Sequence, residues 1–474
     1  MTGPRVSNVT SAMPSAPSAA PRRTARELLR AALVLAAVVA SLGCEDEFTE
    51  RTDGTTSGAL PSGSGGGGST SGAGGGGGGG GAGPVDLHHE VTVSDDYGQP
   101  FEGLPLVVND VDGKVVSTTV TASDGKAVVE VPLDGSLAAF SDDGIEMAIQ
   151  AVYRPPPGAP VVLQVHRALP RGMEPTTYTF FVDDYPPSTA TVGVVASCMN
   201  SSVPVGEPLE VSNELCAYLE APAFLFLARD AAHTVIGWTV RDDIGTSPGL
   251  HLTLGVTATS TDTAASHLST VAAPASATLG SASLAVSAGL ASFQDGGGAP
   301  FDGRGAFTKD AVVPAIPGAV YLTTQATHFS APPSNELVFR YESGDTAPGD
   351  PELDASQAMR VTTEPVDATD PLHPVLSCQV SGEGELDSVT FSSNWASGDR
   401  FVRYDVLVPP DGRSTRLPDI PDDLAQFRPT DAASSVFCRF TGSDSVDGYA
   451  EAVQTPPYPP PPGVTYATDA SYQP

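Results

Sequence analysis

The chain has 474 residues, a formal charge of −33 at pH 7 and 40% apolar residues. A chain this acidic repels phosphate backbones, which excludes nucleic acid as a partner. With 50 glycines and 44 prolines it favours strands and loops over helices, and its length allows two or three domains.

The first 43 residues have the pattern of an export signal. Arginines 22, 23, 26 and 30 precede a run of 13 small or apolar residues, Ala31 to Gly43. A membrane-spanning helix needs roughly 20 apolar residues, so a permanent span is not expected. A basic start, a short apolar core and small residues before the cut are typical of a signal peptide. Met1 and Met13 are both candidates for the residue at which translation begins.

Cys44 ends this run within Ser41-Leu42-Gly43-Cys44. The segment resembles bacterial lipoprotein signals, whose box is Leu, a small residue, Gly or Ala, then Cys. Gly43 and Cys44 match, whereas Ser41 and Leu42 depart from the usual pair. The resemblance implies acylation of Cys44, including palmitate-type chains. The alternatives are ordinary cleavage with free secretion, and a buried structural cysteine. Two or more acyl chains give stable anchoring.

Residues 44–84 are predicted to be a disordered tether. The segment is almost wholly Gly, Ser, Ala and Thr after residue 57, with eight glycines in a row at 74–81. Such a composition cannot bury enough apolar surface to fold. As a random coil it would span roughly 35 Å.

Residues 87–185 are predicted to form a first antiparallel β-sandwich. Short β-branched runs alternate with turn signals, among them Asp112-Gly113, Asp124-Gly125 and Asp134-Gly135. Asp-Gly between such runs is a strong hairpin signal. Residues 99–113 and 115–131 resemble the carboxypeptidase regulatory-like (prealbumin-like) β-sandwich family, and bacterial Ig-like surface modules share nearly the same pattern. The resemblance implies a non-catalytic accessory or surface module.

Two further β-rich units and two irregular segments are predicted. The whole chain is therefore expected to be all-β, with two or three Ig-like or prealbumin-like sandwiches. Within the second unit, residues 260–292 are left open between strands and a long loop. The predicted parts are a second unit at 188–341, an acidic linker at 342–357, a small third sandwich at 358–454 and a Pro-rich disordered tail at 455–474.

The five cysteines support export. Cys44 has no near partner, which leaves two pairs. An odd cysteine in a secreted protein requires an explanation, which acylation provides. We therefore predict the disulfides Cys198–Cys216 and Cys378–Cys438, with buried free thiols as the alternative. Trp395 between the last pair gives a Cys…Trp…Cys order similar to that of Ig sandwiches.

No convincing catalytic or metal constellation is found. Gly245-Thr-Ser-Pro-Gly249 matches G-x-S-x-G, but the residues that follow, Leu250-His-Leu-Thr-Leu-Gly255, have the pattern of a strand, so a hairpin turn is predicted instead of a nucleophile. Residues 88–90 (His-His-Glu) alternate faces on a strand and are interpreted as a solvated entry to it. No cofactor is predicted. Acidic pairs at loop ends leave Ca²⁺ as a minor alternative: residues 95–96, 142–143, 183–184, 242–243 and 422–423.

The sequence predicts a membrane-anchored, extracytoplasmic lipoprotein of the outer membrane or cell surface. It would display β-sandwich modules in a binding or structural role at the cell envelope, without catalysis. Its partners would be the membrane, through the lipid anchor, and an unknown protein or glycan. The alternatives are a surface hydrolase with an unrecognised site in 188–341, an accessory subunit of an enzyme, and a glycan-binding adhesin.

Overall fold

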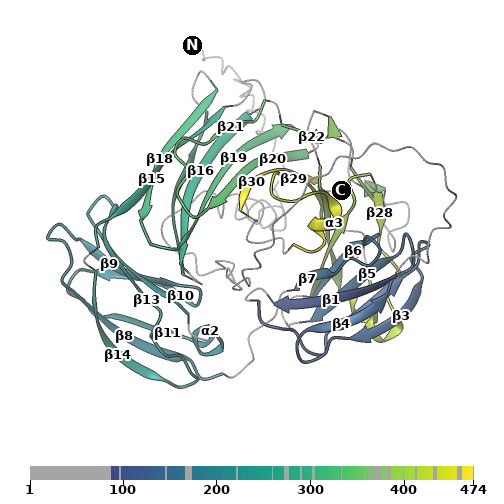
Figure 1. The fold of residues 1–474 in the computed structure, drawn as a ribbon, viewed down its shortest axis with the longest axis horizontal. Coiled ribbons are helices and arrows are strands. Elements are labelled where there is room, and N and C mark those ends of the chain that lie inside the picture. Colours follow the sequence, from purple (N-terminus) through teal and green to yellow (C-terminus); the bar gives the residue numbers. More distant parts are fainter. Residues whose placement is uncertain are drawn as a thin grey trace, which may run out of the picture. The chain divides into compact units, whose positions relative to one another are not determined.

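The computed structural model describes residues 87–472 apart from short breaks, and these residues are almost wholly β (Figure 1). This confirms the all-β prediction. The breaks are 96–97, 143, 145–146, 166–172, 220–221, 259, 272–276, 289–290, 302–304, 332–333, 357, 362–365, 368–374, 379, 382–385, 399, 412–413, 431–434 and 456–461.

The first module is a sandwich of two sheets built from β1 to β7. One sheet has the order β4-β1-β7 and the other contributes β3-β2-β5-β6. Alternate residues such as Val91, Val93, Leu106 and Leu137 face one another in its core. The strands are β1 (His88–Asp95), β2 (Pro105–Asn109), β3 (Val115–Val120), β4 (Lys126–Glu130), β5 (Ser136–Asp142), β6 (Met147–Tyr153) and β7 (Val161–Val165).

The second module begins earlier than predicted. β8 (Thr176–Asp183) pairs with β11 and β14 and not with the first module, so the predicted boundary at residue 185 is wrong. Its aromatic residues Tyr178 and Phe180 pack against Phe224 and Phe226 of the facing sheet. The other elements are β9 (Thr191–Ala196), β10 (Met199–Pro204), β11 (Leu209–Asn213), α2 (Glu214–Tyr218), β12 (Phe224–Arg229), β13 (Val235–Arg241) and β14 (His251–Thr257).

The third module contains residues 260–292, for which the sequence left strands and a long loop as alternatives. The described part of this stretch consists mainly of strands. β21 lies inside the predicted linker and pairs in parallel with β15, so that part of the linker prediction is wrong. Leu268, Leu284 and Val313 lie in a core that also contains Leu225 and Trp238 of the second module. The elements are β15 (Thr263–Val271), β16 (Ala277–Ala288), β17 (Ala291–Ala299), β18 (Ala306–Pro314), β19 (Val320–Ala331), β20 (Ser334–Gly344) and β21 (Glu352–Asp354).

We call residues 360–472 the C-terminal segment. Its last part shows that the predicted disordered tail at 455–474 is wrong, because it contains a strand. β30 (Gly463–Tyr472) pairs with both β20 and β29, so the proline run of 456–462 is followed by a central strand. The remaining elements are β22 (Arg360–Val361), β23 (Val366–Asp367), β24 (Val375–Ser377), β25 (Val380–Ser381), β26 (Ser388–Ser397), β27 (Arg400–Val408), β28 (Ser414–Arg416), the 3₁₀ helix η1 (Asp422–Phe427), β29 (Ser435–Ser443) and α3 (Tyr449–Ala452).

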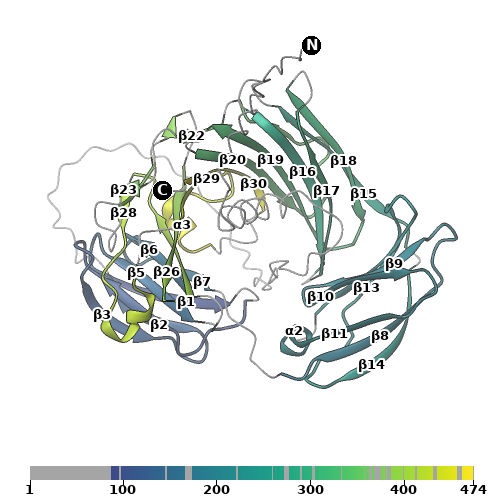
Figure 2. The same ribbon diagram turned by 180° about the vertical axis from the view of Figure 1, so that it is seen from behind.

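One twelve-stranded sheet joins segments that are far apart in sequence. Its order is β17-β16-β19-β20-β30-β29-β26-β27-β6-β5-β2-β3. β6 and β27 pair in parallel, with Ile149 beside Tyr404, and both residues lie in one core with Phe140, Phe391 and Phe427. Figure 2 shows β5, β6 and β26 near one another. The first module therefore shares a core with the C-terminal segment.

Candidate functional site

The predicted anchoring region lies outside the described residues. This covers the signal at 1–43, Cys44 and the tether at 44–84. Among the residues that the structure does describe, no helix is long and apolar enough to cross a membrane.

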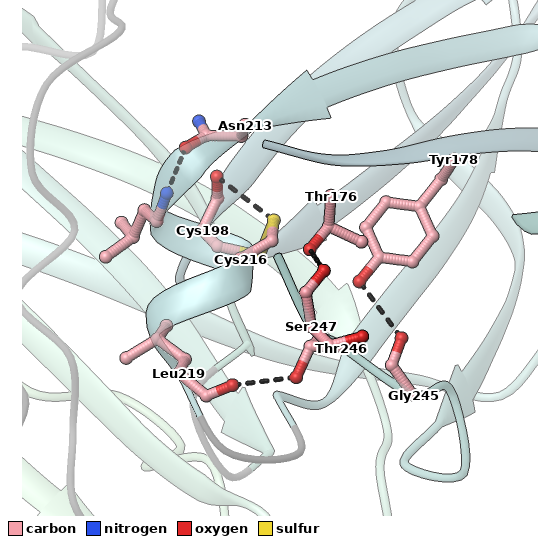
Figure 3. The surroundings of a disulfide bond; sticks show 10 residues. Thr176, Tyr178, Cys198, Asn213, Cys216, Leu219, Gly245, Thr246 and Ser247 are labelled. Carbon is pink, nitrogen blue, oxygen red and sulfur yellow. Dashed lines mark hydrogen bonds between the residues drawn. A yellow bond between two sulfur atoms is a disulfide. The ribbon is translucent and has the colours of Figure 1, made fainter. Parts of the chain in front are cut away.

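The disulfide Cys198–Cys216 forms as predicted. Cys198 lies between β9 and β10, and Cys216 lies on α2, where both side chains are buried. Asn213 caps α2 by accepting a hydrogen bond from the Leu215 backbone N–H at 2.7 Å (Figure 3). The disulfide thus fixes a five-residue helix, too short to persist alone, to the sheet.

The disulfide Cys378–Cys438 also forms as predicted and lies in the core that holds Trp395. The Trp395 indole N–H donates to the carbonyl oxygen of Phe427 at 3.1 Å, which satisfies its polar group inside the core. The Cys…Trp…Cys order therefore corresponds to a real packing unit.

The segment Gly245–Gly249 contains a turn that leads into β14, as predicted, but it is not a hairpin turn, because β13 and β14 belong to different sheets. The carbonyl of Ser247 accepts from the Leu250 N–H at 3.1 Å and from Thr176 Oγ1 at 2.9 Å. Figure 3 shows that Tyr178 and Thr246 make further hydrogen bonds here, to the carbonyl oxygens of Gly245 and Leu219. A nucleophile elbow needs a helix after the serine, and here a strand follows.

His88, His89 and Glu90 lie on β1 with alternating faces. His89 is 1% exposed, and its Nδ1 lies 2.8 Å from the carbonyl oxygen of Ala159, so the interpretation as a solvated entry is wrong for this residue. Glu90 is exposed and pairs with Lys126 at 2.6 Å. The hydrogen bond of Lys126 to Glu90 raises the pKa of the lysine.

In three of the five acidic pairs one aspartate forms an ion pair with an arginine: Asp142, Asp243 and Asp422. Asp243 pairs with Arg241 at 2.6 Å, and Asp422 pairs with Arg428 at 2.7 Å. The hydrogen bond from Arg241 lowers the pKa of Asp243. Within the described ranges no group of three or more His, Cys, Asp or Glu residues is placed to hold a metal ion.

A hollow of about 260 Å³ lies between the first module and the C-terminal segment. Its lining includes Tyr153, Tyr404, Thr415, Arg416 and Asp110. Tyr404 is 2% exposed, and its burial raises its pKa well above the usual range, so its hydroxyl stays protonated. The volume is below that of most small-molecule sites.

A second, more open hollow of about 350 Å³ is acidic. Its lining comprises Ser443, Asp444, Ser445, Val446, Asp447 and Glu451. The carboxylate of the nearby Asp387 accepts hydrogen bonds from the backbone N–H groups of Ser443 and Gly448, at 2.7 and 3.0 Å. These bonds hold the loop between the two residues in place. Neither of these two hollows is lined by residues 188–341, where the sequence left room for a hydrolase site.

No family model and no curated protein matches the chain. Among solved structures, a leucine-rich repeat protein from Bacteroides thetaiotaomicron is 10% identical, with a TM-score of 0.18, over 39% of this chain and 26% of its own. The Bacillus anthracis TIE protein is 7% identical with a TM-score of 0.16, over 57% and 50%. The shaft pilin SpaA from Lactobacillus rhamnosus GG is 10% identical with a TM-score of 0.14, over 57% and 98%. The chain thus spans a quarter to a half of the first two proteins, and TM-scores this low do not establish a shared arrangement.

Proposed function

We propose that this protein is an extracytoplasmic lipoprotein, anchored through acylated Cys44, that displays β-modules in a binding or structural role without catalysis. The main observation that supports this proposal is the pairing of the cysteines. Four of the five cysteines form two buried disulfides, and Cys44 remains at the end of the apolar signal-like run. Buried disulfides belong to oxidising compartments outside the cytoplasm.

The charge and the tether composition support the same proposal. A chain with a net charge of −33 is repelled by an anionic membrane surface, so a lipid anchor is needed to hold it there. The Gly/Ser segment after Cys44 would separate the folded modules from the lipid headgroups. A role without catalysis is supported by Ser247, which lies in a turn that precedes a strand.

The test is membrane partitioning of the full chain expressed in a bacterium. Wild type should enter the detergent phase, and its N-terminal peptide should carry acyl chains in mass spectrometry. Cys44→Ala should stay in the aqueous phase without acylation. Ser41→Leu, which restores the usual first residue of the box, is the matched control and should remain acylated. A wild-type chain that is aqueous and unacylated would contradict the proposal.

A further inference from the structure

Exposed apolar side chains are concentrated in one stretch of the sequence, around β3 and β4. Six of the ten large hydrophobic residues that are exposed in the described part of the chain fall between residues 111 and 133. We call them the β3–β4 patch: Val111, Val115, Val116, Val120, Val128 and Leu133. Scattered exposed hydrophobic residues are normal, but three of these six, Val115, Val116 and Val120, lie on the single strand β3.

The three patch valines on β3 lie on an edge strand. β3 is the last strand of the twelve-stranded sheet, with β2 as its neighbour, and all six of its residues are exposed. The Thr121 N–H donates to the Leu104 carbonyl oxygen at 3.1 Å, toward the β2 side. Because N–H groups alternate along an antiparallel strand, those of Val120 and Thr118 point to the outer edge.

This edge lacks the features that usually prevent strand pairing. Val115 to Val120 reads Val-Val-Ser-Thr-Thr-Val, which has high β-propensity and neither charge nor proline. The strand at the opposite end of the same sheet, β17, contains Asp295 and three glycines, and the edge strand β10 ends at Pro204. β3 therefore presents an edge that is suited to pairing with another strand.

We propose that β3 pairs antiparallel with β3 of a second copy of this chain, around a two-fold axis at Thr118. The strand is self-complementary in this orientation, because Val116 meets Val120 of the other copy and the hydroxyl residues 117–119 meet at the centre. No charged residue lies within β3 itself. Lys114, before the strand, and Asp124, after it, are both exposed, and the antiparallel orientation brings them to the same end of the pair.

The pairing should be weak and sensitive to salt. A six-residue strand and a patch of six side chains are smaller than a standard stable interface, which gives association in the micromolar range or weaker. The net charge of −33 on each copy opposes contact. Since exposed ion pairs contribute little, added salt should strengthen the dimer by screening this repulsion.

Sedimentation velocity of the full chain carrying Cys44→Ala tests the proposal without any lipid contribution. The expected result is a mass that rises from monomer toward dimer with concentration, and more readily at higher salt. Thr118→Pro removes an outward N–H without breaking a bond to β2, and Val120→Lys places a charge on the edge. Both should stay monomeric, whereas the control Val320→Lys, at a valine that is 46% exposed against 57% for Val120, should behave as the parent chain.

Cross-linking gives an independent readout. Thr118→Cys lies near the proposed two-fold axis and should form a disulfide-linked dimer under mild oxidation, whereas Val320→Cys should not. Circular dichroism checks that each variant is folded. A parent chain that is monomeric at all concentrations would overturn the proposal, and so would a dimer that persists in Thr118→Pro and Val120→Lys. Capture of foreign strands by a monomeric chain would point to another occupant of the same edge.

Discussion

The hydroxyl of Tyr449 lies 2.5 Å from the carbonyl oxygen of Tyr153, a residue 296 positions earlier in the chain. The same hydroxyl is 3.1 Å from the carbonyl oxygen of Leu407. It therefore lies where the ends of β6 and β27 meet, and Tyr449 also packs against the first module's core. Burial raises the pKa of Tyr449 well above its usual range, which keeps the phenol protonated as a donor.

Tyr449→Phe should lower the free energy of unfolding by about 1 kcal/mol, because one buried carbonyl loses its donor while the ring packing is kept. Chemical denaturation measures the change. Tyr466→Phe is the matched control, since Tyr466 is 48% exposed and its substitution should have almost no effect. Equal effects of the two substitutions would show that the Tyr449 hydrogen bond does not contribute.

A fragment of residues 87–165, which contains only β1 to β7, should fail to fold cooperatively. Its strands β5 and β6 bury a second face, including Phe140 and Ile149, against residues of the C-terminal segment. Removing that segment exposes this face and leaves the outer edge of β6 unpaired. Urea unfolding followed by circular dichroism should show no sigmoidal transition, in contrast to residues 87–474. A cooperative transition in the short fragment would show that the first module is independent.

The turns were predictable from sequence because their chemistry is local. Gly125 has φ = +72°, and a Cβ there would lie 2.4 Å from the carbonyl oxygen of Val93, so Asp124-Gly125 specifies this turn. The parallel pairing of β6 with β27 was not predictable, because alternation shows which face is buried but not which strand is the partner. One signal was missed. Leu137-Ala-Ala-Phe140 is apolar on both faces, which is typical of a strand buried on both sides.

The disulfides were predictable because only close pairs remained after Cys44 was set aside, whereas β30 was hidden by the proline run before it. Proline prevents backbone pairing only at its own position, because it lacks an N–H group. The residues from Gly463 onward can therefore form a strand. The surroundings of Ser247 could be inferred from the following strand pattern. The hollow beside Tyr404 could not, because its lining comes from segments far apart in sequence.

The two disulfides should differ in their contribution to stability. Cys378–Cys438 spans 60 residues and Cys198–Cys216 spans 18. In the chain-entropy model, loops of these lengths correspond to about 4 and about 3 kcal/mol. The double variants Cys378→Ala/Cys438→Ala and Cys198→Ala/Cys216→Ala should lose stability in that order under denaturant. Peptide mapping without reductant should recover both cross-links, and four free thiols would contradict the pairing.

His267 and His328 should titrate on opposite sides of the ordinary histidine pKa. His267 on β15 lies 2.6 Å from Asp310 on the paired strand β18, and this hydrogen bond, with the charges of Asp310 and Asp350, raises its pKa. Burial lowers the pKa of His328. NMR titration of the two rings measures both values.

The variant Asp310→Asn distinguishes the effect of the carboxylate on the pKa of His267 from the effect of burial on the pKa of His328. Removing the carboxylate should lower the pKa of His267 and leave that of His328 unchanged, because His328 is shifted by burial alone. The raised folded-state pKa means that any stabilisation by the His267–Asp310 pair is complete below the unfolded value of about 6.5 and is lost as pH rises through the folded value. The pair is exposed, so this contribution should be small. If His267 titrates identically with and without Asp310, the ion pair does not form in solution.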